Sequence, residues 1–454
     1  MINFLQKNTK HSYIKKTKRG LAFIIASALV LSGCGLADDI SVSAPVKEPL
    51  MKNVTDENSI NDEEQSKNWE QKNQVVEIEE PGDKESEGEE NSAENDSEKE
   101  SSETTQLSSL TIYTDEELAS AAAVVAGRYA YESLNADEKR VYKQMYLALM
   151  SMSQGAKIDT LDNDAVQKIF ACVYMDNPEI FWTNGYTFTQ YKRGDILEAI
   201  GFAGTYTIDA QEMANRQSRI DSVVANCIAN VPAGDDYVKI KYIYEYIIKN
   251  TEYDKNSIDN QNICSVFLNG RSVCQGYAKA MQYLLNKIGI KCTLVNGTVT
   301  SGESHAWDLV YADGAYYYVD PTWGDATFQV NGEFGGKTPD ITYDYLCVPD
   351  SELFKTHRLS TVIGMPTCQA MADNYFVREN LYFTGVNEEQ LAALFNNSKA
   401  SGKEMVIVKC ADSNVYSAMK QYLINEQNIF KYIDNGQTIS YFQMDDQCYI
   451  GFWL

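Results

Sequence analysis

The chain has 454 residues, of which 44% are hydrophobic and 11% aromatic, enough for two or three domains with a substantial core. Its 64 acidic and 39 basic residues give a net charge of −25. Phosphate binding depends on clustered Lys and Arg, and the sequence of residues 111–454 contains no basic patch. The composition therefore argues against nucleic acid as a partner and against anionic lipid headgroups as the main one.

The first 33 residues are typical of a secretory signal peptide. They contain six Lys and Arg residues and no acid, and an apolar run from Leu21 to Leu31 follows the basic stretch. An apolar run of about eleven residues is too short to span a bilayer as a stable anchor, and small residues come next. We therefore expect residues 1–33 to be removed rather than folded.

The four residues Leu31-Ser32-Gly33-Cys34 resemble the lipobox of bacterial lipoproteins. The resemblance implies that Cys34 is acylated and becomes the mature N-terminus, so that lipid chains anchor the protein without a transmembrane helix. The alternative is ordinary secretory cleavage near Gly33 with an incidental cysteine. The expected location is the outer face of a bacterial cytoplasmic membrane, in the cell envelope.

Residues 34–110 are predicted to form a disordered acidic tether. They contain 22 acidic and 6 basic residues and almost no aromatic ones. Such a segment buries too little apolar surface to offset its ordering entropy, so it stays solvated and repels itself. As a random coil it spans roughly 50 Å. It sets the reach of residues 111–454, which carry the remaining net charge of −15.

Residues 111–230 are expected to form a mainly helical region with one small hairpin. Thr114 and Glu117 have the spacing of a capping box ahead of an Ala-rich helix. Residues 196–208 are strand-like. Further helical patterns cover residues 136–152, 164–175 and 210–229.

Residues 231–355 contain the candidate catalytic residues. After Cys274, apolar side chains recur at helical spacing as far as Ile288, and Gly289 is well placed to end the helix. Cys274 is therefore expected at or just before the first turn of a buried helix, where free N–H groups and the positive end of the dipole favour a thiolate. We interpret Cys274 as a nucleophile, and the alternative is a buried structural cysteine.

His305 and Asp320 lie on two strand-like runs joined by Asp313-Gly314, a pair typical of a two-residue hairpin turn. In that register His305 and Asp320 share one face as diagonal neighbours, so the carboxylate can accept from the imidazole and fix its tautomer. Asp308 falls on the opposite face and is set aside as the orienting acid. A turn longer or shorter by one residue would invert this assignment.

Other residues have simpler interpretations. His357 is more readily explained as a hydrogen-bonded structural residue than as the base. Trp307 and Trp323 either wall a cleft or fill the core. The nine cysteines other than Cys34 are an odd number, so at least one thiol is unpaired, and they show neither C-x-x-C spacing nor a Cys/His cluster of zinc spacing. We therefore expect neither a structural metal nor a cofactor.

Three motifs resemble those of the transglutaminase-like superfamily of cysteine enzymes. They lie at residues 270–278, 304–307 and 318–323. The resemblance implies a papain-like α+β fold in which the nucleophile helix packs on an antiparallel sheet. It also implies a catalytic triad of Cys274 as nucleophile, His305 as general base and acid, and Asp320 as the orienting residue. The implied chemistry is acyl transfer from a carboxamide or peptide carbonyl through a thioester to an amine or water.

Three functional classes stay open, and the expected partner is a protein or peptide substrate at the cell envelope. They are protein cross-linking or deamidation, a cysteine peptidase or amidase with the same triad, and a non-catalytic surface binding module. The Cys274 backbone N–H would be one oxyanion donor; the second cannot be assigned, and a side chain near Tyr253 is only a guess. Residues 356–454 are expected to form a small α/β unit that ends in a hairpin turning at 445–446.

Overall fold

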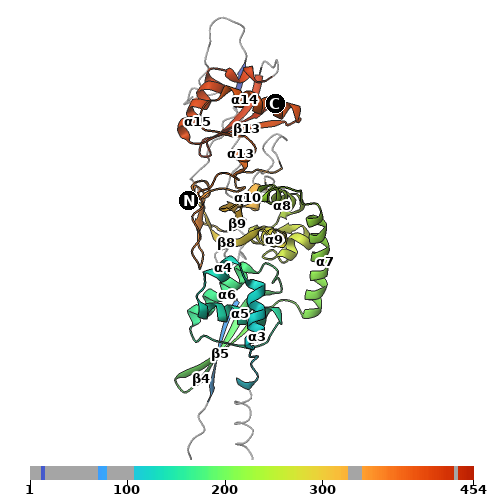
Figure 1. Ribbon diagram of the computed structural model, residues 1–454, viewed down its shortest axis with the longest axis vertical. Helices are drawn as coiled ribbons and strands as arrows, with labels where there is room; N and C mark the ends of the chain where they lie inside the picture. The colour runs from blue at the N-terminus through green and yellow to red at the C-terminus, as the bar shows by residue number, and fades with distance from the viewer. Residues whose placement is uncertain (1–11, 16–69, 79–106, 326–339, 434–437) are drawn as a thin grey trace, which may run out of the picture. The chain divides into compact units, whose positions relative to one another are not determined.

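The structure is a computed structural model (Figure 1), and it describes residues 12–15, 70–78, 107–325, 340–433 and 438–454. Cys34 and most of the predicted signal peptide and tether lie outside these residues. The chain divides into two compact units. The larger comprises Lys52–Gly324 with Tyr345–Gln369, and the smaller comprises Met1–Met51, Asp325–Asp344 and Ala370–Leu454. Among the described helices, none combines the length and apolar character needed to cross a membrane.

Helices and a four-stranded sheet, in which β2 is parallel to β4 and the other pairs are antiparallel, form the first part of the larger unit. The helices are α3 (Asp115–Val125), α4 (Tyr129–Ser133), α5 (Ala136–Met150), α6 (Asn163–Asp176) and α7 (Ala210–Ala229). The strands, in sheet order, are β2 (Glu70–Ile78), β4 (Thr183–Arg193), β5 (Ile196–Tyr206) and β3 (Ala156–Ile158). Thr114 and Glu117 form the expected capping box at the start of α3. Residues 111–230 thus contain these helices and the β4–β5 hairpin, and β2 lies within the residues predicted to form a disordered tether.

A second sheet and two helices form the part of the larger unit that contains the predicted site. The sheet is antiparallel, in the order β10 (Ala315–Val319), β9 (Ser304–Ala312), β8 (Lys291–Val299) and β11 (His357–Leu359). Helix α9 (Cys274–Lys287) packs on β8 and β9, and α8 (Asp236–Asn250) packs on α9. This confirms the predicted α+β class, with the nucleophile helix on an antiparallel sheet.

The hairpin between β9 and β10 has the predicted turn. Ala312 pairs with Ala315, and the two turn residues Asp313 and Gly314 have φ of 47° and 92°. Positive φ at both positions matches the right-handed twist of the flanking strands. The second strand is shorter than expected, because it ends at Val319 and residues Pro321–Gly324 form a helical turn, α10.

The core extends further along the chain than residue 355, where the sequence analysis placed its end. Strand β11 pairs with β8, His357 lying opposite Val299. The short helix α12 (Asp350–Leu353) precedes β11, and the chain as far as Gln369 belongs to the larger unit. The edge strand of the core sheet is thus supplied by residues that follow the predicted boundary.

The smaller unit is an α/β arrangement with the predicted terminal hairpin. Its sheet runs β1 (Ser12–Lys15), β14 (Thr438–Met444), β15 (Tyr449–Trp453), β13 (Met405–Cys410) and β12 (Tyr382–Phe383). Strands β12 and β13 are parallel and the other pairs antiparallel. Its helices are α13 (Tyr375–Arg378), α14 (Glu388–Ala400) and α15 (Ser413–Lys420).

Gly297 lies at the closest approach of β8 to its neighbours, opposite His305 in β9. A Cβ at Gly297 would lie 2.0 Å from the backbone oxygen of Arg358 and 2.5 Å from the Trp307 ring. Because a backbone oxygen cannot rotate away, Gly297→Ala must displace β11. We expect it to lower the free energy of unfolding by about 1–3 kcal/mol, measured by urea denaturation.

Gly364→Ala is the matched control for this substitution, because a Cβ at Gly364 meets nothing within 4 Å. Its unfolding midpoint should stay near that of the unaltered protein. Equal midpoints for Gly297→Ala and Gly364→Ala would contradict the close packing of β8 against β11.

Candidate active site

Cys274 is the first residue of α9, as the sequence predicts. No side chain caps this end of the helix, so the free N–H groups and the positive end of the dipole remain available to stabilise negative charge on Sγ. Cys274 is half-buried, whereas seven of the nine cysteines in the described residues are buried. It packs against Ala278, Leu294 and Ala306, which come from α9, β8 and β9. The nucleophile candidate is thus accessible yet fixed against the sheet.

Gly276 holds the first turn of α9 close to the segment that precedes it. A Cβ there would lie 1.9 Å from Ser272 Oγ and 2.7 Å from Ser265 Oγ. These two hydroxyls are 2.6 Å apart and link strand β7 (Arg271–Ser272) to the helical turn Ser265–Asn269. Only a residue without a side chain allows this contact, which therefore fixes where Cys274 begins the helix.

His305 is the second residue of β9, and its Nε2 lies 2.7 Å from Asp320 Oδ2. Its ring lies between two indoles, with centroids 5.9 Å from Trp307 and 6.0 Å from Trp323. Burial alone would lower the pKa of His305, but the Asp320 carboxylate and the Cys274 thiol together raise it well above its ordinary value. The charged form of the imidazole is therefore favoured beside the sulfur.

Asp320 is fully buried and accepts four hydrogen bonds. Its Oδ1 accepts from the backbone N–H groups of Thr322 at 2.9 Å and Trp323 at 3.0 Å. Its Oδ2 lies 2.7 Å from His305 Nε2 and 3.1 Å from His357 Nε2. Burial raises the pKa of Asp320, but the charge and hydrogen bond of His305, with the hydrogen bond of His357, hold it below the usual range. The group is a carboxylate with every acceptor position used.

His357 is hydrogen-bonded and fully buried, as its structural interpretation requires, but its partner is unexpected. Its Nε2 contacts Asp320, and its Nδ1 lies 2.9 Å from Thr356 Oγ1. Burial lowers the pKa of His357, and the hydrogen bond to Asp320 opposes this only in part. Sequence reasoning missed this contact because it depends on pairing between β8 and β11, which no local pattern specifies. The one available signal was that few histidines exist in the chain.

The ligand atoms of His305, Asp320 and His357 all lie within 4.8 Å of one another, the one such group of potential metal ligands in the part of the chain that the structure describes. Their contacts of 2.7 and 3.1 Å are hydrogen-bond lengths. A metal ion would replace both hydrogen bonds and occupy the nitrogen by which Asp320 orients His305. We therefore treat the group as a hydrogen-bonded cluster.

Asp308 differs from Asp320 although both are fully buried. Asp308 lies opposite Val319 in the hairpin, and its Oδ1 is 3.5 Å from Cys292 Sγ. Burial raises the pKa of Asp308 far above its usual range; the hydrogen bond to Cys292 opposes this and the charge of Asp320 adds to it. A carboxyl whose side-chain contact is with Cys292 rather than with His305 cannot orient the imidazole, so the geometry supports setting Asp308 aside.

The two tryptophans belong to the core. Trp307 and Trp323 are both fully buried and pack in one cluster with Leu309 and Tyr345. Their role is to surround the His305 ring with apolar surface, which excludes water from the contact with Asp320. The position of a second oxyanion donor stays a prediction; Tyr253 lies in strand β6 (Glu252–Tyr253), paired with β7 just before Cys274.

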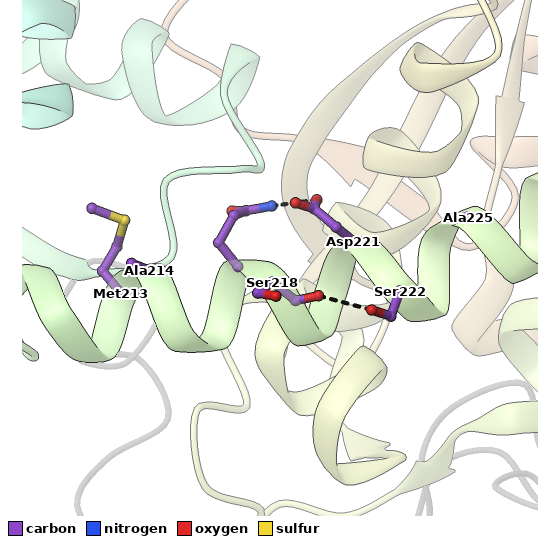
Figure 2. A pocket seen from close by; sticks show the side chains of 7 residues that line it. Met213, Ala214, Ser218, Asp221, Ser222 and Ala225 are labelled. Atoms are coloured by element: carbon purple, nitrogen blue, oxygen red, sulfur yellow. Dashed lines mark hydrogen bonds between the residues drawn. The ribbon is translucent and has the colours of Figure 1, made fainter.

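A pocket elsewhere on the larger unit has no part in this arrangement. Figure 2 shows that it is lined by one face of α7, between residues 213 and 225. Gln217 Nε2 donates within the helix to Asp221 Oδ1 at 2.8 Å, and it also donates to the Tyr283 hydroxyl of α9 at 3.3 Å. Its lining residues do not include Cys274, His305 or Asp320.

Residues 225–321 match the model of the family described as "Transglutaminase-like superfamily". Cys274, His305 and Asp320 all fall within this match. This part of the chain is therefore similar to transglutaminase-like superfamily domains.

More specific similarities are distant. The kyphoscoliosis peptidase of Homo sapiens is 27% identical over 124 residues, which cover 24% of this chain and 18% of that protein. The Mus musculus protein of the same name is 27% identical over 108 residues, covering 20% of this chain and 16% of its own. The chain thus spans less than a fifth of these relatives. A solved structure described as "Crystal structure of a TGase" is 16% identical, with a TM-score of 0.23, and covers 37% of this chain and 52% of that one. The assignment to the superfamily rests on the sequence match.

Asp320→Asn tests which acid controls His305. Without the carboxylate, the positive charge on His305 is less favoured, so fewer molecules hold the thiolate at neutral pH. We expect native alkylation of Cys274 by iodoacetamide at pH 7 to slow by about tenfold or more, as a pKa change of one unit would give. The rate is followed by mass analysis of the Cys274 peptide, which separates it from the half-buried Cys448.

Asp308→Asn is the matched control, because it replaces an equally buried carboxyl of the same hairpin that contacts Cys292 rather than His305. Its Cys274 alkylation rate should stay within about twofold of the unaltered rate. If Asp308→Asn slows the reaction as much as Asp320→Asn, with both proteins folded by circular dichroism, the assignment of the orienting acid is wrong.

Proposed function

We propose that the chain is a thiol acyl-transfer enzyme that acts on carboxamide or amide bonds of proteins or peptides through Cys274, His305 and Asp320. The observation that carries the proposal is the 2.7 Å contact between His305 Nε2 and Asp320 Oδ2, in a histidine whose pKa is also raised by the Cys274 thiol. A nucleophile, a base and a group that orients the base are thereby joined in one buried sheet-and-helix arrangement.

The mechanism follows from which nitrogen of His305 is free. Because Nε2 bonds to Asp320, Nδ1 is the nitrogen that exchanges a proton with Cys274 Sγ. The thiolate attacks the substrate carbonyl, and the Cys274 backbone N–H stabilises the oxyanion. The C–N bond breaks as His305 gives its proton to the leaving amine, which leaves a thioester on Sγ. His305 then takes a proton from the attacking amine or water, and the acyl group leaves the sulfur.

A peptidase or amidase is the second candidate, and the name of the kyphoscoliosis peptidases supports it. The two activities share every step as far as the thioester and differ in the bond attacked and in the acceptor. Nothing in the three residues themselves separates them, because transfer from a Gln side chain and cleavage of a peptide both expel an amine.

Incubation with a labelled primary amine and a Gln-containing protein separates these activities. Amine incorporation supports transfer, a mass gain of one unit per Gln supports deamidation, and new peptide termini support a peptidase. Each product should vanish in Cys274→Ala, which leaves the fold intact because the side chain is only half-buried. If no product forms while Cys274 is alkylated no faster than in the denatured chain, the enzymatic proposal fails and a binding module is left.

The location is proposed from the sequence alone. We propose that Cys34 carries lipid and holds the chain on the outer face of the bacterial membrane, the acidic residues that follow it acting as a spacer. Cys34→Ala should move the protein from the membrane fraction to the soluble or secreted fraction, measured by immunoblot after high-salt washing. Cys34→Ala that stays with the membranes would contradict lipid anchoring.

A further inference from the structure

We propose that His357 is a positioning residue: a neutral ring with its proton on Nε2 holds Asp320 as a carboxylate and so fixes His305 for its exchange with Cys274. The proposal rests on the proposed function, since it assigns one more residue to the same site. It has readouts that need no substrate, however, so the two can fail separately.

The hydrogen positions around Asp320 follow from the acceptor positions of its two oxygens and the donors that face them. The two acceptor positions of Oδ1 are filled by the N–H groups of Thr322 and Trp323. The two of Oδ2 face the Nε2 atoms of His305 and His357. A carboxylate only accepts hydrogen bonds, so both Nε2 atoms must carry hydrogen. The Asp320 contact thus determines the tautomer of His357 as well as that of His305.

The opposite side of the His357 ring agrees with this tautomer. If Nε2 bears the proton of a neutral ring, Nδ1 must accept, and Thr356 Oγ1 lies 2.9 Å away to donate. Thr356 Oγ1 in turn lies 2.6 Å from the Tyr345 hydroxyl, and either oxygen can donate in that bond. With a neutral His357, Thr356 donates to Nδ1 and Tyr345 donates to Thr356; with a charged His357, Thr356 would accept from Nδ1 and donate to Tyr345 or to Leu353 O. The neutral ring is the form favoured by burial and by the positive charge of His305.

Three other rings enclose the His357 ring. It is fully buried, with ring centroids 4.7 Å from Trp323, 4.9 Å from Trp307 and 5.1 Å from Tyr345. The ionisable groups that face it are Asp320, His305 and the Tyr345 hydroxyl, the last through Thr356. Burial and the positive charge of His305 both disfavour a second cation there.

Loss of His357 therefore has a defined effect on the proton between His305 and Cys274. Asp320 would lose one of its four donors, so its Oδ2 would be held by His305 alone and the carboxylate would be less well fixed for holding His305 charged. The imidazolium–thiolate pair would be less populated at neutral pH. The pH at which Cys274 becomes reactive would consequently rise, because the thiolate would form only at higher pH.

Two substitutions at residue 357 separate positioning from packing. His357→Phe keeps a ring but has no donor, and His357→Gln carries an amide donor in the place of Nε2. We expect His357→Phe to slow Cys274 alkylation at pH 7 by about tenfold and to move its pH profile upward by about one unit, while His357→Gln stays within about threefold of the unaltered protein. Asp308→Asn serves as the control with an unchanged profile, and a thermal melt monitors folding of each variant.

Ring-nitrogen chemical shifts of the full-length protein labelled with 15N-histidine give a second readout, which is simple because the chain has only three histidines. His357 should show one protonated and one unprotonated nitrogen throughout pH 5–8, and His357→Gln identifies its signals. A charged ring, a proton on Nδ1, or equal alkylation profiles for His357→Phe and the unaltered protein would overturn the proposal. So would a stoichiometric divalent metal ion that is lost in His357→Gln, because metal on Nε2 excludes the proton.

These results are independent of the acyl-transfer assay. If the tautomer and the shifted profile are observed and no product forms from any substrate, the positioning role stands and the proposed function fails. If product forms and His357→Phe matches the unaltered protein in both rate and pH profile, the proposed function stands and the positioning role fails.

Discussion

The arrangement of the site depends on one buried charge, the carboxylate of Asp320. Burying an ionised carboxyl is costly unless hydrogen bonds replace the water that it loses. Asp320 has four such bonds, two from backbone N–H groups and two from imidazoles. They come from three local structures: β9 supplies His305, β11 supplies His357, and the turn α10 supplies both backbone groups. The strands and the turn must therefore be in place together for the charge to be tolerated.

Part of this arrangement is local and could be predicted from the sequence. Asp313-Gly314 requires positive φ and so defined the β9–β10 hairpin, and the apolar spacing after Cys274 defined α9. The end of β10 was missed although its signal was present. Pro321 has no N–H for the strand ladder, and an Asp followed by Pro is typical of an N-cap and first helical residue. Asp320 Oδ1 makes the corresponding cap bonds, so one side chain both starts α10 and orients His305.

The remainder depends on contacts between segments far apart in the chain, which no local pattern specifies. His357 reaches Asp320 only because β11 pairs with β8, and that pairing requires Gly297, where the Arg358 backbone approaches. Position 276 is similar, since its requirement for glycine arises from two serine hydroxyls outside α9. A sequence shows that these residues are glycines and a histidine, but not what lies against them. The boundary predicted at residue 355 preceded the edge strand of the core for the same reason.

Asp308 and Asp320 show that burial alone does not decide the state of a carboxyl. Both are fully buried and belong to the same hairpin. Asp308 has a thiol at 3.5 Å from one oxygen and, among the described residues, no partner for the other, and its pKa is raised, first by burial. Asp320 is buried to the same extent, but its pKa is lowered because the effects of His305 and His357 are larger than the effect of burial.

The sign of each shift gives its effect on stability. The stabilisation from Asp320 is complete above its unfolded pKa of about 3.9 and is lost as the pH falls through the lower folded value. That from His305 is complete below its unfolded pKa of about 6.5 and is lost as the pH rises through the higher folded value. Between the pH at which the first contribution is lost and the pH at which the second is lost, the Asp320 carboxylate and the His305 imidazolium exist together. Asp308 has the opposite sign, since a proton kept in the folded state lowers stability at neutral pH. The number of donors around each carboxyl, rather than its depth, therefore determines which acid can hold His305 charged beside Cys274.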